Sequence, residues 1–273
     1  MPESHCQLGR ETFVIEDLPV VILAGGLGTR LREETETKPK PMVEIGGYPI
    51  LWHIMKYYAS FGSREFVICL GYKGEKIKDF FLSYQNWHSS MTVDLKSGEV
   101  IRHDGRRDEP WTVHLLDTGL ETMTGGRIGR AARFLGARRF MATYGDGLAD
   151  IDIAELLASH VACSRRATLT ATRPPARFGG LEIEGECVKS FTEKPQIGEG
   201  WINGGFMVFE PGITDFIVSD ETILEREPLE TLSREGQLNA FRHDGFWQPM
   251  DTLRDITFMR DLWDRGNAPW KRW

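Results

Sequence analysis

The chain has 273 residues, of which 41% are hydrophobic and 27% charged, and its formal net charge is −7. This is the composition of a globular protein, and the acidic balance argues against nucleic acid as its main partner. No apolar run approaches the roughly 20 residues of a membrane span, and residues 1–17 lack the basic and apolar regions of a secretory signal. The cysteines, Cys6, Cys69, Cys163 and Cys187, lack the spacing of a zinc site or a disulfide framework, which predicts reduced thiols and a cytoplasmic protein.

The first predicted element is a buried strand at Val20–Leu23, after a polar extension over residues 1–19 and at the start of a single domain over residues 20–273. Its short, β-branched run is bounded by glycines, which is typical of a parallel strand. Gly25, Gly26 and Gly28 then let backbone N–H groups turn outward with no Cβ in the way. Arg30 and Lys40 follow, and fixed cations beside exposed amides suit a polyphosphate ligand.

Two better-known phosphate loops do not fit this stretch. A Walker loop needs Gly-Lys followed by Ser or Thr, and the chain contains no Gly-Lys pair. A dinucleotide-binding loop needs a third glycine at the position of Leu31. The stretch therefore predicts a third kind of phosphate loop.

The next elements alternate between helix and strand. Apolar spacing predicts a helix over residues 50–60, a strand over 65–70 and a short amphipathic helix over 75–82. This order predicts a parallel sheet with right-handed crossovers. Residues 84–111 predict one β-hairpin and a solvated loop, whose charged run, 103–109, is either plain surface or an arm that contacts a neighbouring subunit.

The second half of the chain continues the α/β pattern. We expect strands over 111–116, 140–144, 167–172, 205–209 and 238–242, a hairpin over 181–191, and helices over 128–135, 153–162, 214–218, 229–234 and 252–263. Asp146 follows a strand, at the edge where open α/β sheets bind ligands, although Asp-Gly is also an ordinary turn. Asp251 precedes a helix, where Asp is also an ordinary N-cap.

Several segments resemble those of the sugar-1-phosphate nucleotidyltransferases, which join a sugar 1-phosphate to a nucleoside triphosphate and release pyrophosphate. The segments are GGLGTRL with KPKPM, YGDG, FTEKP, WINGG and QPMDT, and the resemblance extends from Val20 to Trp270. It implies an α/β fold of the nucleotide-diphospho-sugar transferase type, with a Rossmann-like, mixed but mostly parallel sheet flanked by helices and a small β-rich sugar-side portion. It also implies Mg²⁺ as cofactor and a homo-oligomer.

The resemblance assigns roles to individual residues. Arg30, Lys40 and Asp146 are expected to be catalytic, and Asp146 and Asp251 to hold the metal. The nucleotide is expected to contact Leu23, Ala24, Gly25, Gly26, Gly28, Thr29, Arg30, Lys40, Thr118, Gly126, Arg127 and Gly145. The sugar phosphate is expected to contact Tyr144, Glu193, Lys194, Asn203 and Gly204. These residue types suit the chemistry, because carboxylates accept from vicinal hydroxyls, lysine neutralises phosphate and Mg²⁺ prefers hard oxygen ligands.

One branch of the family is favoured by DTG followed by MTGGR, and by GFWQPMDTLRD. By this resemblance CTP and α-D-glucose 1-phosphate react by direct in-line attack to give CDP-glucose and pyrophosphate. Arg127 would donate to O2 and N3 of cytosine, whereas uracil presents a donor at N3; a surface position is the ordinary alternative for this arginine. Two other functions remain open: a transferase for UTP, dTTP or another hexose 1-phosphate, and a non-catalytic nucleotide-sugar-binding regulator.

Overall fold

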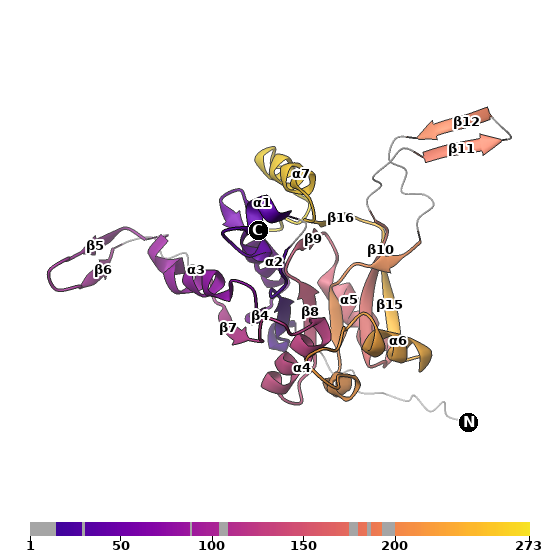
Figure 1. Ribbon diagram of the computed structural model, residues 1–273, viewed down its shortest axis with the longest axis horizontal. Coiled ribbons are helices and arrows are strands. Elements are labelled where there is room, and N and C mark those ends of the chain that lie inside the picture. Colours follow the sequence, from indigo (N-terminus) through magenta and orange to yellow (C-terminus); the bar gives the residue numbers. More distant parts are fainter. Residues whose placement is uncertain are drawn as a thin grey trace, which may run out of the picture.

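A computed structural model of the chain describes residues 15–28, 31–87, 89–103, 109–174, 180–184, 187–192 and 200–273. Figure 1 shows a central body, from which two hairpins project on different sides. None of the described helices is long and apolar enough to cross a membrane.

An eight-stranded sheet forms the centre of the body. Its strands lie in the order β13 (Ile202–Asn203), β10 (Ala167–Thr172), β14 (Met207–Phe209), β8 (Phe140–Tyr144), β1 (Val20–Leu23), β4 (Glu65–Leu70) and β7 (Thr112–Asp117), and β15 (Leu238–His243) pairs with β10. Strands β8, β1, β4 and β7 are mutually parallel, whereas β14 is antiparallel to β8 and β10. The expected mixed, mostly parallel sheet is therefore confirmed.

Helices and 3-10 turns connect the strands. They are η1 (Ile15–Asp17), α1 (Arg32–Thr35), η3 (Lys40–Met42), α2 (Ile50–Ala59), α3 (Gly74–Trp87), α4 (Thr124–Leu135), α5 (Ile153–Cys163), η4 (Pro211–Phe216), α6 (Glu227–Arg234) and α7 (Leu253–Asp264). Helices pack against both faces of the sheet. Successive side chains of a strand point to opposite faces, so each strand contributes to an apolar cluster on either side. Val20 and Ile22 of β1 pack in one core cluster with residues of α2, α5 and α7, and Val21 and Leu23 pack in the other with residues of α4, η4 and α6.

Four short strand pairs lie beside the sheet in the described part of the chain. They are β2 (Glu44–Ile45) with β3 (Tyr48–Pro49), β5 (Met91–Val93) with β6 (Val100–Arg102), β9 (Gly147–Ala149) with β16 (Trp247–Pro249), and β11 (Gly180–Glu184) with β12 (Cys187–Thr192). The β5–β6 and β11–β12 hairpins are the two projections in Figure 1, and both were predicted. The β9–β16 pair was not predicted, and it joins segments about 100 residues apart.

The structure corrects four of the predicted elements. The short helix expected over 75–82 is α3, which extends to Trp87 and includes the start of the stretch 84–111 that was expected to be hairpin and loop. The helix expected over 128–135 begins at Thr124, because Gly125 and Gly126 allow its first turn to pack closely; a Cβ on Gly126 would lie 2.6 Å from the carbonyl oxygen of Asp220. The helix expected over 214–218 is the 3-10 turn η4. The strand expected over 205–209 is shorter, because Gly205 and Phe206 have φ angles of +74° and +44° that interrupt it.

Candidate active site

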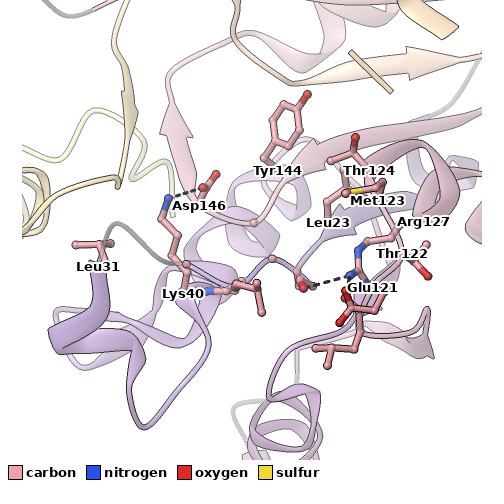
Figure 2. A pocket seen from close by; sticks show the side chains of 18 of the residues that line it. Leu23, Leu31, Lys40, Glu121, Thr122, Met123, Thr124, Arg127, Tyr144 and Asp146 are labelled. Atoms are coloured by element: carbon pink, nitrogen blue, oxygen red, sulfur yellow. Dashed lines mark hydrogen bonds and ion pairs between the residues drawn. The ribbon is translucent and has the colours of Figure 1, made fainter. Parts of the chain in front are cut away.

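A cavity of about 490 Å³ opens at the edge of the sheet where β1 and β8 end. Its lining comes from the loop Leu23–Gly28, from Leu31, Lys40 and Pro41, from the segment Leu120–Thr124 with Arg127, and from Tyr144, Gly145, Asp146 and Asp251. In Figure 2, Lys40 and Asp146 lie on one side of the pocket and Thr122, Met123, Thr124 and Arg127 on the other, with Tyr144 between them. The volume lies within the range of about 300–1,000 Å³ that is usual for small-molecule sites.

The glycine loop forms one wall of this cavity. Backbone hydrogen bonds hold it to the end of β4, because Ala24 N–H donates to the Cys69 carbonyl at 3.1 Å and the Gly25 carbonyl accepts from Tyr72 N–H at 3.3 Å. Gly28 has a φ of +61°, and a Cβ on Gly26 would face open space. The loop thus presents backbone to the cavity, as the sequence predicted. Thr29 and Arg30 lie outside the described residues.

Lys40, Asp146 and Asp251 meet at one point of the cavity. The Nζ atom of Lys40 lies 2.6 Å from Oδ2 of Asp146 and 2.7 Å from Oδ1 of Asp251. All three side chains are partly shielded, with 12%, 32% and 20% of their surfaces exposed. Burial alone lowers the pKa of Lys40, but the charges and hydrogen bonds of the two carboxylates outweigh it and raise this pKa above its ordinary value. The amine is therefore a fixed ammonium at neutral pH.

Three structural features bring these residues together. Lys40 begins the turn η3, where Pro39 and Pro41 restrict the backbone. Gly145 anchors the end of β8 to β1 by donating its N–H to the Leu23 carbonyl, and a Cβ there would lie 2.8 Å from that oxygen. The β9–β16 pair sets Gly147 opposite Pro249, and Met250 N–H donates to the Asp146 carbonyl. The two aspartates are therefore adjacent although 105 positions separate them.

The carboxylate pair also fits a divalent cation. Oxygens of Asp146 and Asp251 lie within 2.7 Å of the same point, the Lys40 ammonium. Mg²⁺ usually takes one or two protein carboxylates and fills its remaining positions with substrate phosphates and water. Within the described residues, no cluster of three or more His, Cys, Asp or Glu side chains offers another metal site.

Arg127 lies beneath the glycine loop and is buried, with 5% of its surface exposed. Its Nη1 donates to the Leu70 carbonyl and Thr118 Oγ1, and its Nη2 donates to the carbonyls of Gly25 and Leu120. Burial lowers the pKa of this guanidinium. The expected surface alternative for Arg127 is thus wrong, and a contact from Nη to a base would require one of these hydrogen bonds to open. The expected base contact stays a prediction.

Two other residues predicted for the nucleotide lie just behind the cavity wall. Thr118 is buried and donates its hydroxyl to the Leu70 carbonyl at 2.6 Å. Gly126 packs in the first turn of α4, and its N–H donates to the Thr222 carbonyl at 3.2 Å. Neither residue lines the cavity, but the segment between them, Leu120–Thr124, does.

The residues predicted for the sugar lie along the ends of β8 and β13. Tyr144 lines the cavity, and its hydroxyl accepts a hydrogen bond from Asn203 Nδ2 at 3.3 Å. Gly204 is fixed next to Asn203, because its carbonyl accepts from Trp247 Nε1 at 2.8 Å. Glu193 and Lys194 lie outside the described residues.

Two parts of the site were not named residue by residue from the sequence. Thr122, Met123 and Thr124 line the cavity, and they lie in the region from Thr118 to Arg127 that the resemblance places near the base. Glu225 accepts hydrogen bonds from Tyr144 and Thr124, and nothing in its surrounding sequence, TILEREPLE, indicates such a role.

Comparisons with known proteins identify relatives of this chain over most of its length. The model of the family described as nucleotidyl transferase matches residues 19–248. The chain is 53% identical to glucose-1-phosphate cytidylyltransferase of Salmonella typhi over 257 residues, which is 94% of this chain and 100% of the relative. It is 43% identical to a probable glucose-1-phosphate cytidylyltransferase of Bacillus subtilis over the same shares of both chains.

Solved structures show the same fold. HddC from Yersinia pseudotuberculosis, complexed with GMP-PN, superimposes with a TM-score of 0.67 and 25% identity over 90% of this chain and 99% of its own. A UDP-glucose pyrophosphorylase complexed with UDP-glucose superimposes with a TM-score of 0.63 at 16% identity, over 91% of this chain and 99% of its own, and supports the fold alone.

Proposed function

This chain belongs to the nucleotidyl transferase family, and we propose that it transfers a cytidylyl group from CTP to α-D-glucose 1-phosphate, giving CDP-glucose and pyrophosphate. The observation that carries the proposal is the similarity to the Salmonella cytidylyltransferase over the whole length of that relative. The meeting of Lys40, Asp146 and Asp251 beside a glycine loop supports it, since this arrangement suits a reaction between two phosphates.

The reaction brings together two anions, so cations and oriented amides must offset their repulsion. The attacking phosphate oxygen forms a bond to the α-phosphorus while the bond to the pyrophosphate oxygen breaks, and charge builds on the oxygens between them. The glycine loop would bind the triphosphate through its N–H groups, and the Lys40 ammonium would stabilise the α-phosphate or the attacking phosphate. Arg30 and Thr29 are proposed to contact the leaving pyrophosphate.

We propose Mg²⁺ as the cofactor, held by Asp146 and Asp251. When bound, the cation would neutralise phosphate charge at the reacting centre. Lys40, which donates to both carboxylates in this structure, would also pair with the substrate phosphates by charge-assisted hydrogen bonds. Hydrogen bonds fix the backbone at both carboxylates, because Asp255 accepts from the Asp251 N–H and the Asp146 carbonyl accepts from Met250 N–H.

The sugar phosphate is proposed to lie across Tyr144, Asn203 and Gly204. The side chain of Glu193 would accept from hexose hydroxyls, and Lys194 would pair with the sugar phosphate. Thr118, Gly126 and Arg127 would act on the base side, where Arg127 donates to Thr118 and to the Leu120 carbonyl.

A turnover panel tests the proposal. Pyrophosphate release is measured with CTP, UTP, dTTP and GTP against several hexose 1-phosphates, with and without Mg²⁺. The expected result is the highest kcat/KM for CTP with glucose 1-phosphate and no turnover without the divalent cation. Preference for UTP or dTTP would contradict the cytidylyl assignment, and binding of CDP-glucose without turnover of any pair would favour the regulatory alternative.

We also propose where the protein works and how it assembles. The protein would work in the cytoplasm, where thiols stay reduced, and Cys69 and Cys163 are both free. It would also form a homo-oligomer, in which a second copy covers the β5–β6 hairpin. All residues of both hairpin strands are exposed, including Val93, Val100 and Ile101, and an isolated two-stranded hairpin is marginally stable in water.

A further inference from the structure

Glu225 lies in the connection between η4 and α6, outside every segment that the sequence analysis assigned to the site. Its Oε1 accepts a hydrogen bond from the Tyr144 hydroxyl at 2.5 Å, and its Oε2 accepts from the Thr124 hydroxyl at 2.7 Å. Tyr144 comes from the end of β8 and Thr124 from the start of α4, and both line the cavity (Figure 2). One carboxylate therefore joins the sugar side of the cavity to its nucleotide side.

The hydrogen bonds around Glu225 have a fixed direction. Burial first, and the charge of Glu225 next, raise the pKa of Tyr144, so its hydroxyl stays protonated and donates to the carboxylate. The phenolic oxygen is then left to accept, and it accepts from Asn203 Nδ2 at 3.3 Å. The Asn203 amide cannot flip, because its Oδ1 accepts from Gly205 N–H at 3.0 Å.

The direction of these hydrogen bonds decides which donors the site presents to a sugar. Asn203 has two Nδ2 hydrogens, and the hydrogen bonds of the described residues use one of them, with Tyr144. The other is a donor that a hydroxyl oxygen of a hexose can accept. On the opposite side of Glu225, the Thr124 hydroxyl donates to the carboxylate and accepts from Leu224 N–H at 3.0 Å, which fixes this part of the nucleotide wall.

We propose that Glu225 is a positioning residue that orients Tyr144 and Asn203 for the sugar phosphate while tying them to Thr124. The inference rests on the proposed function, because it assumes that the sugar lies at Tyr144 and Asn203. Glu225 acts through these side chains, so its loss should weaken binding of the sugar phosphate more than binding of the nucleotide.

The test is the substitution Glu225→Gln. An amide oxygen can accept from one of the two hydroxyls, but the amide nitrogen donates, so the hydroxyl of either Tyr144 or Thr124 loses its acceptor at position 225 and must turn its proton elsewhere. We expect the KM for glucose 1-phosphate to rise about tenfold, the size expected for one disrupted hydrogen-bond array, while the KM for CTP stays within about twofold. Calorimetric titration of the variant with glucose 1-phosphate in the presence of CDP should show the same loss of affinity without turnover.

A double-mutant cycle with Tyr144→Phe tests whether Glu225 positions the sugar phosphate by way of the Tyr144 side chain. If Glu225 acts through the Tyr144 hydroxyl, adding Glu225→Gln to Tyr144→Phe should change the sugar KM by less than about twofold. Glu221→Gln is the matched control, since it removes the same charge from an exposed side chain four residues away. An unchanged sugar KM in Glu225→Gln, or fully additive effects in the cycle, would overturn the proposal.

These measurements distinguish failure of the proposed role of Glu225 from failure of the proposed function. If wild-type protein turned over a different nucleotide and sugar phosphate, the proposed substrates would be wrong, and the cycle run with that pair would still decide on Glu225. If wild-type protein used CTP and glucose 1-phosphate but Glu225→Gln behaved like Glu221→Gln, the inference alone would fail.

Discussion

Lys40 carries the charge that keeps two aspartates close together. Without a cation between them, Asp146 and Asp251 would repel each other across a partly buried space. The same ammonium is available to phosphates that enter the cavity. A substitution by Asn can test the charge of each carboxylate in turnover separately from stability, since Asn keeps the shape of Asp and removes its charge.

We predict that Asp146→Asn and Asp251→Asn each lower kcat by about 100-fold or more, because a neutral amide is a poor ligand for Mg²⁺. The fold should survive, since both side chains lie at the cavity and not in the apolar core. Pyrophosphate release over a range of Mg²⁺ concentrations measures the effect, and circular dichroism reports the fold. Full activity in either variant would refute the metal assignment.

Protonation of His53 makes the free energy of unfolding depend on pH. It is buried in α2, its Nε2 lies 2.8 Å from the Ile45 carbonyl, and burial lowers its pKa from the ordinary 6.5 to about 4. Between these values the unfolded chain binds a proton that the folded chain does not, so acidification favours unfolding. We predict that His53 removes about 2 kcal/mol of unfolding free energy between pH 7 and pH 5.

Urea denaturation at pH 7, 6 and 5 measures this dependence. In His53→Gln the fall in stability between pH 7 and pH 5 should be smaller than in the wild type, whatever the stability at pH 7. His103→Gln, which changes an exposed histidine, should leave the pH dependence as it is. A variant at position 53 with the wild-type pH dependence would show that another group is responsible.

At the scale of elements, the start of α7 positions Asp251. Thr252 and Asp255 form a capping box, and Asp255 Oδ2 also accepts from the Asp251 N–H at 3.0 Å. Asp255 further accepts from Gln248 Nε2 of β16, so one carboxylate links the strand, Asp251 and the helix. The backbone of Asp251 is thus fixed by the same contacts that begin the helix.

We predict that Asp255→Ala lowers kcat about tenfold and the unfolding free energy by about 1 kcal/mol, because a cap is lost and Asp251 gains freedom. Asp152→Ala is the matched control. Asp152 caps α5 by accepting from the N–H groups of Ala154 and Glu155, and it does not line the cavity. It should cost similar stability and leave kcat unchanged. Equal losses of activity in both variants would assign the effect to stability.

At the scale of the whole molecule, the β5–β6 hairpin is the surface at which we propose that a second copy binds. It projects from the body beyond α3, and its residues Val93 and Val100 face each other across the strands with 45% and 44% of their surfaces exposed. Exposed apolar side chains gathered on one projection commonly mark an interface between protein chains.

We predict that Val93→Lys with Val100→Glu shifts the protein toward its 31.1 kDa monomer. The two new charges lie opposite each other, so they support the hairpin while they remove its apolar surface. Light scattering after size-exclusion chromatography measures the mass. Val218→Lys alters another exposed apolar residue, and should leave the mass unchanged. An oligomer of unchanged mass in the double variant would exclude the hairpin from the interface.

The sequence alone predicted the mostly parallel sheet, the glycine loop after its first strand and, through the family resemblance, the reaction class. These features are local: a four-residue apolar run, glycines next to it and a lysine between prolines can be recognised without knowing the rest of the fold. Periodicity also predicted most helices and strands, because one-sided burial leaves a pattern of apolar residues every two or every three to four positions.

The tertiary structure alone decided which residues meet. Asp146 and Asp251 become neighbours through β9 and β16, strands of three residues that are too short to leave a pattern. Burial of Arg127 depends on glycines in two other segments, Gly25 and Gly71, and Glu225 reaches Tyr144 and Thr124 from a connection with no local signal. Such contacts join residues about 80 to 100 positions apart, whereas periodicity records only the environment of one element.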